Sequence, residues 1–268
     1  MTVEVVNRAR LTDEIRAVAG QIADMIRPLS DTGVPIPSSD WTVGEAGAHL
    51  AITQGLFRDL IQETAISPYE DARAEVFAQV NARSLADYPE RDGPTLANLI
   101  VERTQAALEA GAAHPDTYRI ETHFGPMEVL VISSYMLTHL LMHGCQIADA
   151  LGQPHPIKAA HVELALPFLK MAIAHFFDRE AAAALKASFE IRMRGGSRFA
   201  VICDRGDVRV QDDVPKRVDV HISADPVAFF SVGTGLISQW GPIARGKMTA
   251  WGVKPWLAFR FKILVPNP

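Results

Sequence analysis

The sequence has few of the features that mark secreted, membrane-spanning or nucleic-acid-binding proteins. Only two of its 268 residues are cysteines, Cys145 and Cys203, which is too few for a disulfide framework and fits a reducing compartment. It contains no uninterrupted apolar run of about 18 residues, so we expect no segment that spans a membrane. Its net charge of −5 argues against a general nucleic-acid binder. The first residues lack the basic-then-apolar build of a signal peptide, so we expect a cytoplasmic protein without membrane or nucleic-acid partners.

The first part of the chain has the apolar periodicity of long amphipathic helices. Apolar residues recur at intervals of three and four along residues 3–29, 42–63, 71–87, 95–113 and 126–152. Thr42 and Glu45 form a capping-box pattern at one start, Pro126 is expected in the first turn of the last helix, and Gly152 is expected to end it. We therefore predict an all-α four-helix bundle over residues 1–155.

The second part changes to a period of two after one further helical stretch at residues 158–178. Alternating apolar and polar residues predict strands near residues 189–193, 199–203, 208–210 and 218–222. Asp225 followed by Pro226 predicts the N-cap and first turn of a short helix. We expect residues 156–268 to form a small α+β domain.

Two histidines stand four residues apart in the helix expected at 126–152. His139 and His143 therefore lie on the same helical face, among Leu, Met and Ala residues. One explanation is a divalent metal, because neutral imidazole is a good ligand for zinc, nickel, copper and iron. The alternative is one satisfied core histidine and one surface histidine. His49, on the apolar side of the helix expected at 42–63, supplies a third candidate ligand.

Three segments resemble the DinB-like metalloenzymes and, within them, the mycothiol-dependent maleylpyruvate isomerase group. Residues 40–50, which include Trp41-Thr42-Val43 and His49-Leu50, are similar to the family's Trp-Thr-Val…His-Leu segment at the start of its second helix. Asn81 and Arg83 lie where the family often places Asn and Arg. Residues 139–152 are similar to its Glu-x-x-x-His-Gly-Trp-Asp segment.

The resemblance implies that His49, His139 and His143 bind a metal, with zinc as the first expectation and nickel, iron or copper as alternatives. His139 stands where the mycothiol group has glutamate, and Cys145-Gln146 stands where it has Trp-Asp. Three neutral ligands leave the full 2+ charge on the ion, which acidifies a bound thiol or water more than a carboxylate-containing set would.

The resemblance also suggests residues for catalysis and cofactor binding. Asn81 and Arg83 are the catalytic candidates, and Arg83 is in addition expected to hold a carboxylate or amide of a thiol cofactor. Arg245 is a further candidate for cofactor binding at the edge of the ligand cleft. The alternative for these side chains is a solvated surface.

The second half resembles the sterol-carrier-protein-like domain. The resemblance rests on residues 218–230, Gly235 and residues 244–252, which include Gly246-Lys247-Met248 and Gly252. Only a fold is inferred from it.

With the three candidate ligands, the resemblance implies a metal-dependent enzyme, a maleylpyruvate-isomerase-like isomerase or transferase. We expect it to use a low-molecular-weight thiol, mycothiol first, for S-transfer to, or isomerisation of, an electrophilic small molecule. A monomer and a homodimer are both compatible with the sequence. The alternatives are a non-catalytic small-molecule or lipid carrier or sensor with a structural metal, and a metal-hydroxide hydrolase.

Overall fold

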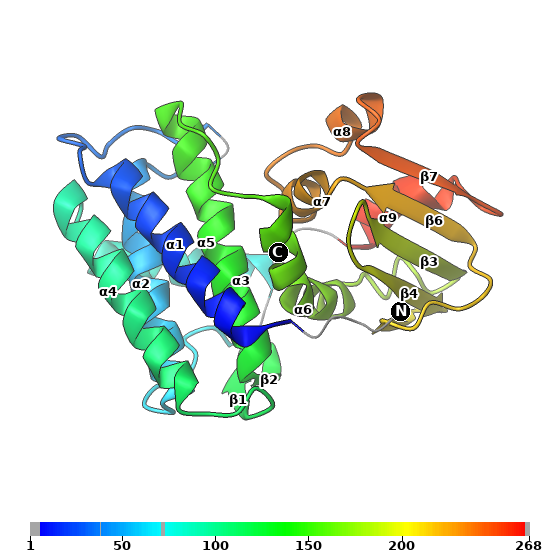
Figure 1. Ribbon diagram of the computed structural model, residues 1–268, viewed down its shortest axis with the longest axis horizontal. Coiled ribbons are helices and arrows are strands. Elements are labelled where there is room, and N and C mark those ends of the chain that lie inside the picture. Colours follow the sequence, from blue (N-terminus) through cyan, green and yellow to red (C-terminus); the bar gives the residue numbers. More distant parts are fainter. Residues whose placement is uncertain (1–5, 38, 71–72, 266–268) are drawn as a thin grey trace. The chain divides into compact units, whose positions relative to one another are not determined.

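A computed structural model of the protein describes residues 6–37, 39–70 and 73–265. The chain divides into two compact units, a helical unit formed by Asn7–Ile157 and a sheet unit formed by the chain from Lys158 onward. This confirms the expected order of a helical region followed by a region that contains a sheet (Figure 1). The elements of the helical unit are α1 (Arg8–Ile26), α2 (Val43–Ile61), α3 (Ala74–Asp87), α4 (Gly93–Ala112), β1 (Arg119–Thr122), β2 (Gly125–Glu128) and α5 (Val129–Leu151).

Four long helices build the core of the helical unit. α1 packs on α4 and α5, and α2 packs on the same two helices, while the shorter α3 contacts α2. Small residues allow close approach, since a Cβ at Gly47 of α2 would lie 3.3 Å from Leu96 of α4 and one at Gly144 of α5 would lie 3.0 Å from Ile22 of α1. Each helix buries an apolar stripe in this core.

The local signals set most of the helix ends. The capping box of Thr42 and Glu45 is confirmed, and Gly152 ends α5 in the left-handed conformation with φ of 61°. The prediction for Pro126 was wrong, because Pro126 lies in β2 and pairs with Glu121 of β1, and α5 begins only at Val129. The helix starts predicted at residues 3 and 71 lie outside the described residues.

The sheet unit is built on a five-stranded sheet with the order β5-β4-β3-β6-β7. β3 runs parallel to β6, and the other neighbouring pairs are antiparallel. One face of the sheet is apolar and buried, and Phe189, Val201 and Ile222 lie on it. The elements are α6 (Ala159–His175), β3 (Lys186–Met193), β4 (Arg198–Asp204), β5 (Asp207–Gln211), β6 (Val220–Ala224), α7 (Pro226–Gly233), α8 (Trp240–Ala244), β7 (Met248–Gly252) and α9 (Leu257–Leu264).

The start of α7 agrees with the prediction from the sequence, whereas the elements near the end of the chain were not predicted. Asp225 caps α7, with its carboxylate accepting a hydrogen bond from the backbone N–H of Ala228, as predicted. β7, α8 and α9 were not predicted. No helix in the described part of the chain is long and apolar enough to cross a membrane.

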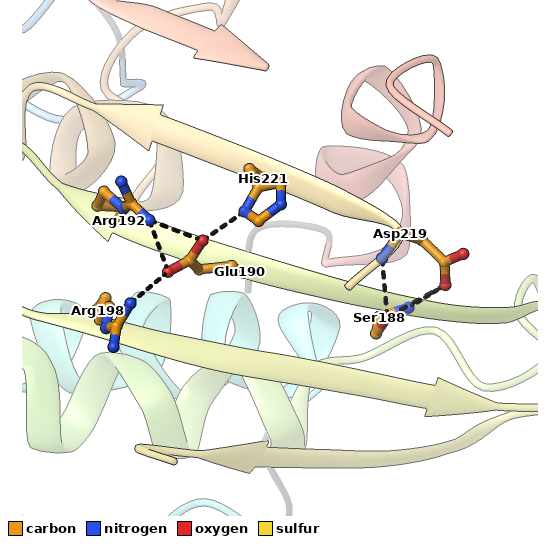
Figure 2. Close-up of polar contacts among 6 residues, drawn as sticks. All are labelled: Ser188, Glu190, Arg192, Arg198, Asp219 and His221. Carbon is orange, nitrogen blue, oxygen red and sulfur yellow. Dashed lines mark hydrogen bonds and ion pairs between the residues drawn. The ribbon is translucent and has the colours of Figure 1, made fainter. Parts of the chain in front are cut away.

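A buried carboxylate lies on the polar face of the sheet (Figure 2). Glu190 of β3 has only 2% of its side chain exposed and accepts hydrogen bonds from Arg192 at 3.1 Å and from Arg198 of β4 at 3.4 Å. Its other oxygen contacts Nδ1 of His221, which the parallel pairing of β3 with β6 places beside it. We call these four residues the Glu190 cluster.

Candidate metal centre

The three predicted metal ligands come together inside the helical unit. His49 is on α2, and His139 and His143 are one turn apart on α5, each with less than a tenth of its surface exposed. Potential ligand nitrogens from the three rings all lie within 4.8 Å of one another. The Nε2 atoms of His49 and His139 are 3.0 Å apart. We call these three residues the histidine cluster.

The sequence brings these rings together by two different routes. The i, i+4 spacing on one helix places His139 next to His143, with ring centroids 4.6 Å apart. His49 lies 90 residues away from His139 in the chain and reaches it only because α2 packs on α5. Its ring centroid is 4.9 Å from each of the other two.

Burial keeps the three rings neutral near neutral pH. It holds the pKa of His49 and of His139 well below the ordinary 6.5, and repulsion from His143 lowers both further. The pKa of His143 falls to about 4, chiefly because of burial, and the hydrogen bond with Gln146 partly opposes the fall. Neutral imidazole is the form that offers a lone pair to a metal.

Neighbouring polar groups orient two of the rings. Nδ1 of His143 is 2.7 Å from Oε1 of Gln146, so in the tautomer that donates there, Nε2 keeps its lone pair. Thr53 lies 3.5 Å from Nδ1 of His139, while its hydroxyl donates to the carbonyl of His49 at 2.9 Å. Neither role was predicted from the sequence, although the spacing of three between His143 and Gln146 on one helix was a signal for the first of them.

Aromatic side chains form the surroundings of the histidine cluster. The ring of Trp41 lies 4.9 Å from that of His49 and 5.7 Å from that of His143. The rings of Tyr135 and Phe57 lie 6.0 Å and 6.3 Å from that of His139. These neighbours carry no charge near neutral pH, because burial raises the already high pKa of Tyr135 further. The cluster thus lies in apolar surroundings, which strengthen electrostatic interactions.

No hydrogen bond or ion pair joins the other predicted site residues to the histidine cluster within the described part of the chain. Asn81 accepts a hydrogen bond from the hydroxyl of Tyr69 at 2.8 Å. Arg83 is exposed on α3 and forms no hydrogen bond or ion pair within the described parts of the chain. Arg245 is exposed at the end of α8 in the sheet unit. Their roles in catalysis and cofactor binding stay predictions.

The donor set fits a divalent metal of the zinc type. Three neutral imidazoles pointing into one space match an open site with three protein ligands, which leaves a further position for a small molecule. Without a cation, the lone pairs of the buried rings would face one another with too few N–H or O–H groups to bond them. Each buried acceptor left without a hydrogen bond costs about 1–3 kcal/mol of stability.

The comparisons with known proteins agree with the resemblance found in the sequence. The chain is similar over 93% of its length to the crystal structures of a mycothiol-dependent maleylpyruvate isomerase and of a mutant with one histidine changed to alanine. Both matches have 13% sequence identity and cover 95% of the other chain, with TM-scores of 0.51 and 0.52, which shows a shared fold. No curated protein matches the sequence. The family model for the mycothiol maleylpyruvate isomerase N-terminal domain matches residues 15–148, half of the chain, and the protein therefore belongs to this family.

Proposed function

We propose that the protein is a metal-dependent enzyme that uses a low-molecular-weight thiol, with mycothiol as the first expectation, to isomerise an electrophilic small molecule or to transfer sulfur to it. The single observation that carries the proposal is the convergence of three buried, neutral histidines within 4.8 Å. The family and the fold, which are those of a mycothiol-dependent maleylpyruvate isomerase, support it. We further propose that the helical unit is a DinB-like four-helix bundle and that the sheet unit is sterol-carrier-protein-like.

His49, His139 and His143 would hold the ion through one ring nitrogen each. A divalent cation held by them would lower the pKa of a thiol bound beside it, so that the nucleophilic thiolate would predominate at neutral pH. Gln146 fixes the ring of His143, and Trp41 and Phe57 limit the access of water. Because no carboxylate belongs to the described cluster, its ligands leave the positive charge uncompensated and favour an anionic partner such as a thiolate.

Isomerisation and S-transfer begin with the same thiolate and differ in which bond breaks. For isomerisation, the sulfur adds to one carbon of an activated double bond, rotation occurs about the resulting single bond, and loss of the same thiolate restores the double bond. For S-transfer, the sulfur displaces a leaving group, which departs with the bonding electron pair. The first outcome returns the thiol unchanged, and the second consumes it.

The test measures metal content and thiol dependence on the same preparation. We expect about one zinc-type ion per chain, turnover of a cis-configured activated alkene only with added mycothiol, loss of activity on chelation and recovery on zinc addition. Turnover without any added thiol would refute the thiol scheme and indicate metal-assisted hydrolysis. A stably bound metal with no turnover under any of these conditions, together with binding of a small molecule, would support a carrier instead.

A further inference from the structure

The last helix carries an apolar stripe on its exposed side. Trp256, which caps α9, and Phe259 and Ile263 within it recur at intervals of three and four, with exposed fractions of 60%, 47% and 64%. Leu257 and Leu264, on the other side of α9, are buried. A helix that is apolar on both sides is normally covered on both, so the exposed stripe indicates a binding surface.

α8 extends this stripe. The ring of Trp240 stacks on that of Phe259, with centroids 5.9 Å apart and an interplanar angle of 23°, and 59% of Trp240 is exposed. We call Trp240, Trp256, Phe259 and Ile263 the tryptophan face. Three of the four tryptophans of the protein occur at or after position 240.

The charge around the tryptophan face has one sign. Residues 226–268 contain five basic residues and no acidic residue, although the whole chain has a net charge of −5. Arg260 lies in α9 next in sequence to Phe259, and Arg245 is the C-cap of the helix that begins with Trp240. Arg245, Lys247 and Arg260 are exposed and form no ion pair with any described residue, whereas Lys254 pairs with Asp219 at 3.0 Å.

We propose that the tryptophan face docks on the surface of an anionic lipid bilayer. Indole rings prefer the boundary between water and hydrocarbon, and unpaired cations beside them are attracted to anionic headgroups. A two-fold contact between copies fits less well, because it would place the cations of one face against the same cations of the other. The docking is peripheral, since no described helix could span the bilayer.

The test is co-sedimentation of the full-length protein with vesicles of phosphatidylcholine alone or of phosphatidylcholine with phosphatidylglycerol. We expect binding to the anionic vesicles, weakening with added salt, and a blue shift of tryptophan fluorescence. The double substitution Trp256→Ala and Phe259→Ala should weaken binding by about tenfold or more, and Arg260→Gln by about fivefold. The matched control is Ile66→Ala, which removes a side chain that is 93% exposed in the helical unit.

Thermal unfolding of each variant checks that the fold is kept, since these side chains are exposed. Equal binding by the double variant and the Ile66→Ala control, or no binding to anionic vesicles, would overturn the proposal. So would a dimer in sedimentation equilibrium that the double variant abolishes, because a second copy would then occupy the face. The readout is independent of enzymatic turnover.

Discussion

The two units bury polar groups in opposite ways. The histidine cluster brings together three groups of the same kind, and their neighbours add no opposite charge. The Glu190 cluster surrounds one carboxylate with two guanidinium groups and an imidazole. The charge of the carboxylate is balanced by groups of the protein itself. The converging imidazole lone pairs have no such partner and are satisfied only when a ligand binds. The contrast indicates a binding role for the histidine cluster and a structural role for the Glu190 cluster.

The largest expected effect comes from removing one member of the histidine cluster. His143→Ala should remove the metal and lower activity by more than about a hundredfold, because loss of a ligand should exceed the 10–100-fold cost typical of losing its outer partner. Metal analysis and turnover of the same preparation measure this. The control is His155→Ala, which removes an exposed histidine paired with Asp149. Equal metal content in both variants would remove the basis for the metal centre.

The second prediction concerns the dependence of stability on pH. The histidine cluster and the Glu190 cluster should affect stability in different pH ranges. In metal-free protein the unfolded chain binds protons on these histidines below about pH 6.5, whereas the folded histidine cluster excludes them, so stability falls as the pH falls. A fall in the pKa of His143 from 6.5 to about 4 corresponds to a loss of about 3 kcal/mol in the free energy of unfolding at low pH.

The Glu190 cluster should respond only at lower pH. Burial alone would raise the pKa of Glu190, but hydrogen bonds from His221 and Arg192 hold it below the ordinary 4.5. Its contribution is therefore complete above 4.5 and is lost as the pH falls through the folded-state pKa. Urea unfolding of chelated protein across this range tests both statements. Constant stability between pH 6.5 and 4.5 would contradict the statement about the histidine cluster.

Sequence and structure agree best where the signal is local. The pair His139 and His143 followed from helical spacing, and Thr42 with Glu45 followed from capping chemistry. His49 was a candidate from its place on the apolar side of its helix, but only the family resemblance implied that it meets the other two, because its approach depends on the packing of α2 on α5. Pro126 was misplaced because proline fits both a helical first turn and the edge of a short hairpin.

The Glu190 cluster shows what alternation alone cannot predict. The period-two pattern placed Glu190 on the polar face of its strand, and its side chain does lie there. Its burial depends on the register that brings Arg192 opposite Arg198 and on the parallel pairing that brings in His221. Neither register nor strand order can be read from one strand, so the burial of this carboxylate was not foreseen.

The third prediction breaks the Glu190 cluster. Glu190→Gln keeps the shape but removes the charge that Arg192 and Arg198 share, and we expect a loss of about 1–3 kcal/mol in the free energy of unfolding. The lower part of this range is the better expectation, because both arginines are about half exposed and water can solvate them. Metal content should not change. The control, Glu102→Gln on an exposed position of α4, should change stability by less than about 0.5 kcal/mol.

The fourth prediction tests the support of the histidine cluster. Gln146→Ala should weaken metal affinity by about 10–100-fold, because Nδ1 of His143 loses the partner that fixes its ring. Competition with a chelator measures this affinity. Gln146→Glu keeps an acceptor at the same place and should restore tight binding. Equal metal affinity in the parent and in both Gln146 variants would show that Gln146 does not position the ring of His143.

The smallest effect is expected at Cys145, two residues beyond His143. Its side chain is fully buried, and burial together with the nearby Asp149 raises its pKa to about 12, so it is a neutral thiol at neutral pH. An offset of two positions on a helix directs the Cys145 side chain away from the face that carries His139 and His143. Cys145→Ala should therefore cost about 1 kcal/mol of stability and leave both metal content and mycothiol-dependent turnover close to those of the parent. Cys203→Ala, in a buried strand position of the sheet unit, is the matched control. If Cys145→Ala alone abolished turnover, the reacting sulfur would come from the chain itself, and the scheme with an external thiol would have to be abandoned.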